Sequence, residues 1–165
     1  MRPRPHHARS RQRGLSAVEF AVVGAAVFML LFGVIEVARA AFARTMLGEG
    51  IRRAARLAAV CPVNDPYIIN AARFEEKNWG ARLIPNLAAR NVSLQYLDIN
   101  GAVIADPATD FTSIRFARVT VAGYAIPLFM PYIDFTYQPG PVSSTQPAES
   151  LGVSPTEIRP CLPTP

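Results

Sequence analysis

The chain has 165 residues, half of them apolar, and a formal net charge of +5. This length is enough for one modest domain and a short additional segment. The positive charge is confined to residues 1–14, which contain five arginines and no acidic residue, so residues 15–165 are formally neutral. A nucleic-acid binder carries its basic surface on the folded domain, so this distribution argues against nucleic acid as a partner.

Residues 1–14 are predicted to be a basic cytoplasmic leader, and residues 15–35 a transmembrane helix. A helix over residues 15–35 is about 31 Å long, close to the hydrocarbon thickness of a bilayer. The arginines of the leader predict that the N-terminus stays in the cytoplasm and that the rest of the chain is exported. We therefore expect a single-pass membrane protein.

Glu19 is the informative residue of the apolar segment, where Ser16 is the only other polar side chain. A carboxylate inside an apolar membrane helix is costly, and such groups are usually functional. One interpretation is that Glu19 reaches the cytoplasmic headgroups or is neutral. Another starts from the order of residues: a basic leader ends in Gly14, and the hydrophobic helix after it carries Glu at its fifth position. This order resembles a type IV prepilin-type cleavage site.

The resemblance implies that a membrane peptidase cuts between Gly14 and Leu15. Cleavage would create a cationic amine on Leu15, and the Glu19 carboxylate of a neighbouring subunit could neutralise it inside an apolar bundle. A competing interpretation is an ordinary secretory signal peptide, cleaved near the small residues of 38–40 or 41–43. The long leader, the long apolar run and Glu19 argue against it.

The helical pattern continues through residues 36–60 as an amphipathic extension. Apolar residues recur there at spacings of three and four, namely at Val37, Ala40, Ala41, Leu47, Gly48, Ile51, Ala55 and Ala58. Pro62 is a natural stop, so one helix over residues 15–60 is predicted. Gly48 and Gly50 are expected to be weak points or places of close approach. Helical spacing also predicts that Glu36 meets Arg39 and that Glu49 meets Arg53.

Three stretches together resemble the TadE-like family, the minor pseudopilins of the tight-adherence (Tad, or Flp) pilus system. They are residues 13–21 (RGLSAVEFA), 33–39 (GVIEVAR) and 51–60 (IRRAARLAAV). By position, Gly14 is the last leader residue, Glu19 is the glutamate of the processing motif, and Phe20 stands where the family often has Tyr.

The family resemblance implies a bacterial inner-membrane protein with a periplasmic domain that supports assembly of Flp pili for adherence. The partners it implies are a prepilin peptidase, other Tad pilins and pseudopilins, the inner-membrane pilus assembly platform and the lipid bilayer. The alternative is a membrane-tethered periplasmic binding or sensory module that is never cleaved.

Residues 61–137 are predicted to form a periplasmic α+β domain, a small antiparallel sheet packed on the end of the long helix. The elements expected in it are a turn at 64–66, a helix at 67–79, a strand at 92–98, a hairpin turn at Asn100 and Gly101, a return strand at 102–105, a strand within 111–126, and an aromatic segment at 129–137 broken by Pro131.

Residues 138–165 form a tail with seven prolines, for which we expect no regular structure unless Cys161 holds it in place. Cys61 and Cys161 are the two cysteines. An even count in an exported segment predicts one disulfide, worth about 4–5 kcal/mol in the chain-entropy model. Two free thiols are the alternative.

No catalytic constellation is visible in the sequence. Both histidines, His6 and His7, lie in the leader, which removes histidine-based triads and zinc sites from the exported part. The acidic pairs, Glu75 with Glu76 and Asp106 with Asp110, are interpreted as solvated surface. We expect no enzyme activity, no metal and no cofactor.

Overall fold

The computed structural model describes residues 12–75, 84–130, 133–153, 157 and 161. Its elements are two α-helices, α1 (Gln12–Val60) and α2 (Pro66–Ala72), two short 3₁₀ helices (Ala89–Asn91 and Phe111–Ser113), and the strands β1 (Val92–Leu97), β2 (Phe116–Val121), β3 (Ile126–Met130), β4 (Ile133–Tyr137) and β5 (Val142–Pro147). The long N-terminal helix followed by a small antiparallel sheet confirms the predicted α+β class.

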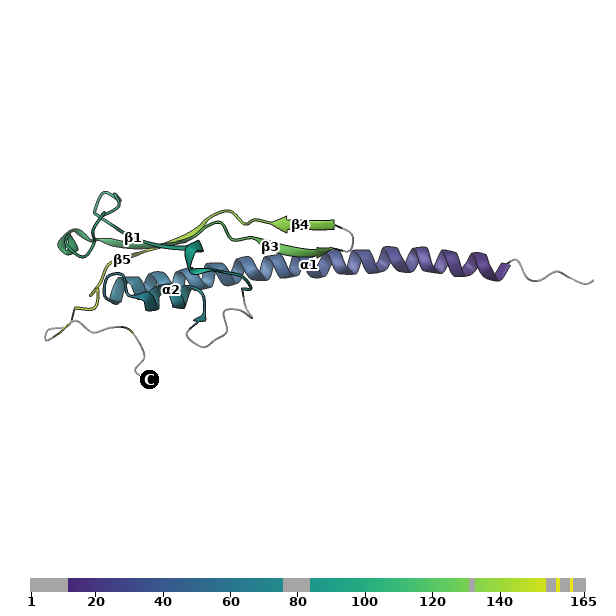
Figure 1. Cartoon of the computed structure of the whole chain (residues 1–165), viewed down its shortest axis with the longest axis horizontal. Helices are drawn as coiled ribbons and strands as arrows, with labels where there is room; N and C mark the ends of the chain where they lie inside the picture. Colours follow the sequence, from purple (N-terminus) through teal and green to yellow (C-terminus); the bar gives the residue numbers. More distant parts are fainter. Residues whose placement is uncertain (1–11, 76–83, 131–132, 154–156, 158–160, 162–165) are drawn as a thin grey trace, which may run out of the picture.

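The helix α1 has 49 residues and is therefore about 73 Å long. No proline interrupts it, and alanine and leucine, the strongest helix formers, are frequent in it. The sheet lies along the C-terminal half of α1, whereas the N-terminal half extends beyond every other element (Figure 1). The predicted continuous helix is confirmed, and it begins three residues earlier than expected.

The last carbonyls of α1 are capped by a segment from near the other end of the chain. The Ala59 carbonyl accepts hydrogen bonds from the N–H groups of Glu149 (2.9 Å) and Leu151 (3.3 Å), and the Val60 carbonyl accepts one from Gly152 (2.6 Å). These carbonyls have no partner within a helix, so the cap satisfies groups that would otherwise need water. Gly152 has φ +79°, and a Cβ there would lie 2.5 Å from the Pro62 side chain, so both conformation and space favour glycine.

Four of the strands form one long hairpin. Its first arm consists of β2 and β3, and its second arm consists of β4 and β5. Phe116 lies opposite Pro147 and Val121 opposite Val142, while farther along Ile126 lies opposite Tyr137 and Met130 opposite Ile133. This is one unchanged antiparallel register, interrupted at residues 122–125 and 138–141. The strand β1 pairs with the other edge of β2, giving the order β1-β2-β5, and β3-β4 continues the hairpin toward the middle of α1 (Figure 1).

The Pro-rich tail contradicts the expectation of no regular structure, because β5 lies within it. Between Pro141 and Pro147, residues 142–146 have free N–H groups, and these residues pair with β2 in full register. Proline removes a ladder hydrogen bond only at its own position, so Pro141, directly before the strand, and Pro147, its last residue, do not prevent it from forming.

The strand predicted at 102–105 is reduced to a single bridge between Leu97 and Val103. The turn before it forms as predicted, because the Asp98 carboxylate accepts hydrogen bonds from the N–H groups of Asn100 and Ala102, both at 2.8 Å. The chain then turns again at Asp106, whose carbonyl accepts the Asp110 N–H, and the return strand ends there.

The remaining predicted elements of the domain differ in extent. The segment 111–126 divides into a 3₁₀ helix, β2 and the start of β3, and the aromatic segment 129–137 contains the end of β3 and all of β4. The helix predicted at 67–79 covers only Pro66–Ala72, where Asp65 caps it by accepting the Tyr67 N–H (2.9 Å), and Phe74 has φ +58° just after its end. Residues 76–83 of that prediction lie outside the described residues.

The core lies between the alanine-rich face of α1, the sheet and α2. Leu47, Ile51, Ala55 and Ala58 of the predicted stripe are buried, whereas Val37 is exposed. Small side chains let the neighbouring elements approach the helix closely, and Gly50 is the tightest point, since a Cβ there would collide with the Ala72 carbonyl oxygen. The predicted close approach at Gly50 is therefore confirmed.

Gly50→Ala should destabilise the fold by about 1–3 kcal/mol, because the added methyl group overpacks the contact with α2. Gly48→Ala is the matched control: its nearest neighbour is the flexible end of Arg52 at 3.4 Å, so it should be neutral or stabilise the helix by up to about 1 kcal/mol. Denaturant unfolding of the full chain in detergent micelles measures both variants. Equal free energies of unfolding for the two would contradict the packing described.

Candidate functional site

The N-terminal half of α1 exposes a continuous apolar surface. Its exposed large apolar residues are Val18, Phe20, Val22, Val23, Val27, Phe28, Met29, Leu30, Leu31, Phe32, Val34, Ile35 and Val37. A patch of this extent on a protein surface marks contact with lipid or with another protein. Among the described residues, α1 is the one helix that is long and apolar enough to cross a membrane.

The predicted processing residues lie at the start of this surface. Gly14 and Leu15 are in the first turn of α1, where N–H groups lack intrahelical partners and helices fray. Glu19 and Phe20 follow on the next turn and are both exposed. The structure thus brings the four residues to one end of α1, next to the leader, whose residues 1–11 lie outside the described part.

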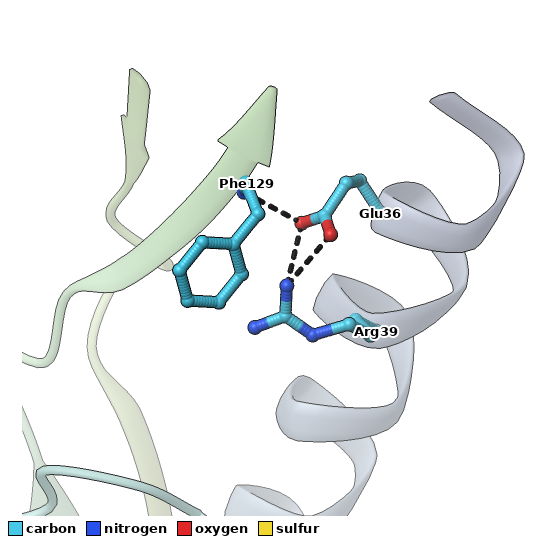
Figure 2. A network of polar contacts seen from close by, with 3 residues as sticks. All are labelled: Glu36, Arg39 and Phe129. Carbon is cyan, nitrogen blue, oxygen red and sulfur yellow. Dashed lines mark hydrogen bonds and ion pairs between the residues drawn. The ribbon is translucent and has the colours of Figure 1, made fainter. Parts of the chain in front are cut away.

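A buried carboxylate marks the place where α1 passes from its exposed half to its packed half. Glu36 is 5% exposed, and both of its oxygens accept hydrogen bonds from Arg39 Nη1 at 2.7 Å. Its Oε2 also accepts the backbone N–H of Phe129 in β3, at 3.1 Å. Figure 2 shows the carboxylate between the strand and the arginine. The charge is thereby paired and hydrogen-bonded, which a buried carboxylate requires.

The Phe129 N–H belongs to the edge of β3 that faces away from β4 and toward α1. An open strand edge is a template for unwanted pairing, and the Glu36 carboxylate covers this one. Arg39 completes the contact, because its guanidinium carbon lies 4.8 Å from the centroid of the Phe129 ring. Sequence spacing predicted the Glu36–Arg39 pair, but no local pattern indicated Phe129, which is far away in sequence.

Tyr124 and Tyr96 are buried tyrosines of the sheet domain. Tyr124 donates a hydrogen bond to the Pro85 carbonyl (2.8 Å); burial raises its pKa, and the charge of Arg39 opposes that shift. Tyr96 accepts the Asn64 N–H (3.2 Å); burial and the charge of Asp65 raise its pKa, while this hydrogen bond lowers it. Both phenols therefore stay neutral at physiological pH and serve as hydrogen-bonding core residues.

The C-terminal tail is fastened beside the end of α1. Cys61 and Cys161 form the predicted disulfide. The Cys161 N–H donates to Asp65 Oδ2 (3.1 Å), so the residue that caps α2 also holds the tail. Disulfide, cap and α1 terminus together fix the end of the sheet domain that lies farthest from the exposed half of α1.

Comparison with known proteins shows that part of α1 matches a known family. The family model described as TadE-like protein matches residues 14–56. This segment is a TadE-like domain. It covers the exposed half of α1 and most of its packed half, and it fits a membrane-anchored protein associated with the Tad pilus. No curated protein and no solved structure shows significant similarity to the chain.

The TadE-like segment begins at the residue that the sequence pattern predicted to be the last of the leader.

In the part of the chain that the structure describes, no group of three or more His, Cys, Asp or Glu residues could hold a metal ion. Glu49 pairs with Arg52 at 3.7 Å, on the exposed face of the packed half of α1.

Glu36→Leu should free the edge of β3, because the Phe129 N–H loses its acceptor at a cost of about 1–3 kcal/mol. Hydrogen exchange of the Phe129 amide in the full chain should then be roughly tenfold faster or more, by the same free energy. Glu36→Gln is the matched control, since its amide oxygen still accepts the N–H and only the ion pair is lost. Unchanged protection of the Phe129 amide in Glu36→Leu would contradict the role given to Glu36 at the edge of β3.

Proposed function

We propose that the protein is a TadE-like minor pseudopilin, held in the bacterial inner membrane by α1 and supporting assembly of Tad pili for adherence. Its N-terminus is cytoplasmic, its sheet domain is periplasmic, and a prepilin peptidase cleaves the chain between Gly14 and Leu15. The partners are that peptidase, other Tad pilins and pseudopilins, and the membrane platform of the pilus machinery. The protein acts in assembly and not as an enzyme.

The observation that carries the proposal is the coincidence of the family match with the exposed half of α1. The match begins at residue 14, directly before the apolar surface. The five arginines of residues 1–14 favour a cytoplasmic leader. A disulfide between Cys61 and Cys161 is typical of an oxidising compartment, which supports export of the sheet domain.

The proposed mechanism follows from the charges near the cleavage site. Removal of the leader takes away its arginines and leaves one cationic amine on Leu15. Within a bundle of apolar helices, that amine and the Glu19 carboxylate of a neighbour are each costly alone, and pairing them lowers the cost of both. Glu19 is exposed on the isolated chain and so is accessible to a neighbouring helix.

Glu19→Ala should leave insertion into the membrane intact and reduce piliation, because the Leu15 amine loses its partner in the assembled bundle. Membrane fractionation and counts of surface pili in cells that carry the variant measure the two effects. Glu49→Ala is the matched control: it removes an exposed carboxylate from the same helix, outside the apolar half. Normal pili in cells with Glu19→Ala would contradict the proposed role of Glu19.

A further inference from the structure

The end of the long hairpin lies beside the place where the apolar half of α1 finishes. Tyr137, at the start of the β3-β4 section, lies 3.5 Å from Arg44 of α1, measured from Oη to Nη1. Phe129, near the other end of that section, bonds to Glu36. From Arg44 to Glu36 the helix rises about 12 Å toward its N-terminus, so the hairpin runs toward the apolar segment. Figure 1 shows β3 ending and β4 beginning alongside the middle of α1.

Three apolar side chains of β3 and β4 are exposed. Phe129 is 69% exposed and Phe135 is 54% exposed, and Pro127 of β3 is exposed as well. On α1, the neighbouring residues Ile35 and Val37 are also exposed. Phe129 and Phe135 lie on opposite faces of β3-β4, because Phe129 is paired with Asp134 and Leu128 with Phe135. The bond from Phe129 to Glu36 places these aromatic residues near the level along α1 at which its exposed apolar residues end.

The level of these exposed residues along α1 indicates that they contact the lipid headgroup region. If residues 15–35 span the hydrocarbon core, Glu36 and Arg39 lie at the level of the lipid headgroups. Phe129 is held at that level by its bond to Glu36 and by the contact of its ring with Arg39. Aromatic side chains are concentrated at such membrane–water boundaries, and a partly exposed arginine beside them can reach phosphate groups.

We propose that Phe129 of β3 and Phe135 of β4 form a second membrane contact, in which both side chains rest in the interfacial layer of the same bilayer that α1 crosses. The Glu36–Arg39 pair holds the hairpin at the correct height. This inference rests on the membrane anchorage in the proposed function. With the helix and the hairpin both in contact with lipid, the sheet domain keeps its β3-β4 section at the membrane surface.

Tryptophan fluorescence in lipid vesicles tests the contact. The full chain is reconstituted into phosphatidylcholine vesicles with a minor share of phosphatidylglycerol, with lipids brominated either near the headgroup or deep in the acyl chain. Trp79→Phe removes the sole native tryptophan. Single tryptophans are then placed by Phe129→Trp, and by Phe135→Trp in case the first variant fails to fold.

Two further positions make the result specific. Ile99→Trp is the matched control, because Ile99 is 70% exposed, as Phe129 is, but lies beyond β1 at the end of the domain away from the hairpin end. Phe28→Trp lies within the apolar half of α1 and reports whether the helix is in the lipid at all.

The expected result is loss of emission at positions 129 and 135 with the shallow brominated lipids, loss at position 28 with the deep ones, and no loss at position 99. Loss of emission at position 28 without loss at 129 or 135 would overturn the hairpin contact and leave the anchor intact. The exposed aromatic residues would then be assigned to contact with another protein. No loss at position 28 would contradict the membrane anchor itself, and the hairpin contact with it.

Discussion

The backbone hydrogen bonds of α1 run without interruption from Gln12 to Val60, so the exposed apolar half and the half that carries the sheet form one rod. Each half needs a different environment. The packed half presents small residues such as Ala54, Ala55 and Ala58 to the sheet, whereas the exposed half presents large apolar side chains to its surroundings. The other described elements are arranged along this rod, and among them the sheet has no second long element to pack against.

The sheet domain is attached to α1 at two widely separated places. At the C-terminal end, residues 149–152 cap the helix, and the disulfide holds the chain beyond them. Near the middle of the helix, Glu36 accepts the N–H of Phe129 and so fixes the far end of the hairpin. A hairpin held at both ends lies parallel to the helix, which explains how its aromatic end comes to lie at the border of the apolar half.

Sequence reasoning succeeded where the signal was local. An apolar run followed by a three-and-four spacing identified α1 and much of its buried face, and Asn100 and Gly101 identified a turn. It failed where the outcome depends on distant partners. No residue near Val142 indicates that this segment will pair with β2, and the proline content of the tail predicted no regular structure there. Glu36 was expected to meet Arg39, but its burial depends on β3, some ninety residues later.

The processing site shows the same difference between features fixed by the local sequence and features that depend on partners. Gly14, Leu15, Glu19 and Phe20 were selected by their order along the chain, and the family match at residues 14–56 includes all four positions. Their position at one end of α1 follows from the helix alone. Cleavage and the pairing of Glu19 with a neighbour involve other molecules, so the geometry of this single chain supports them only through the exposure of that end of the helix.

The most direct test of the account is the N-terminus and intact mass of the protein purified from its native membrane, with and without the prepilin peptidase. We predict a chain that begins at Leu15 when the peptidase is present and at Met1 when it is absent. A chain that begins at Met1 in both cases would contradict processing and favour an uncleaved, membrane-tethered binding module. A chain that begins near Ala41 or Arg44 would mean a released secretory protein and would contradict the membrane anchor.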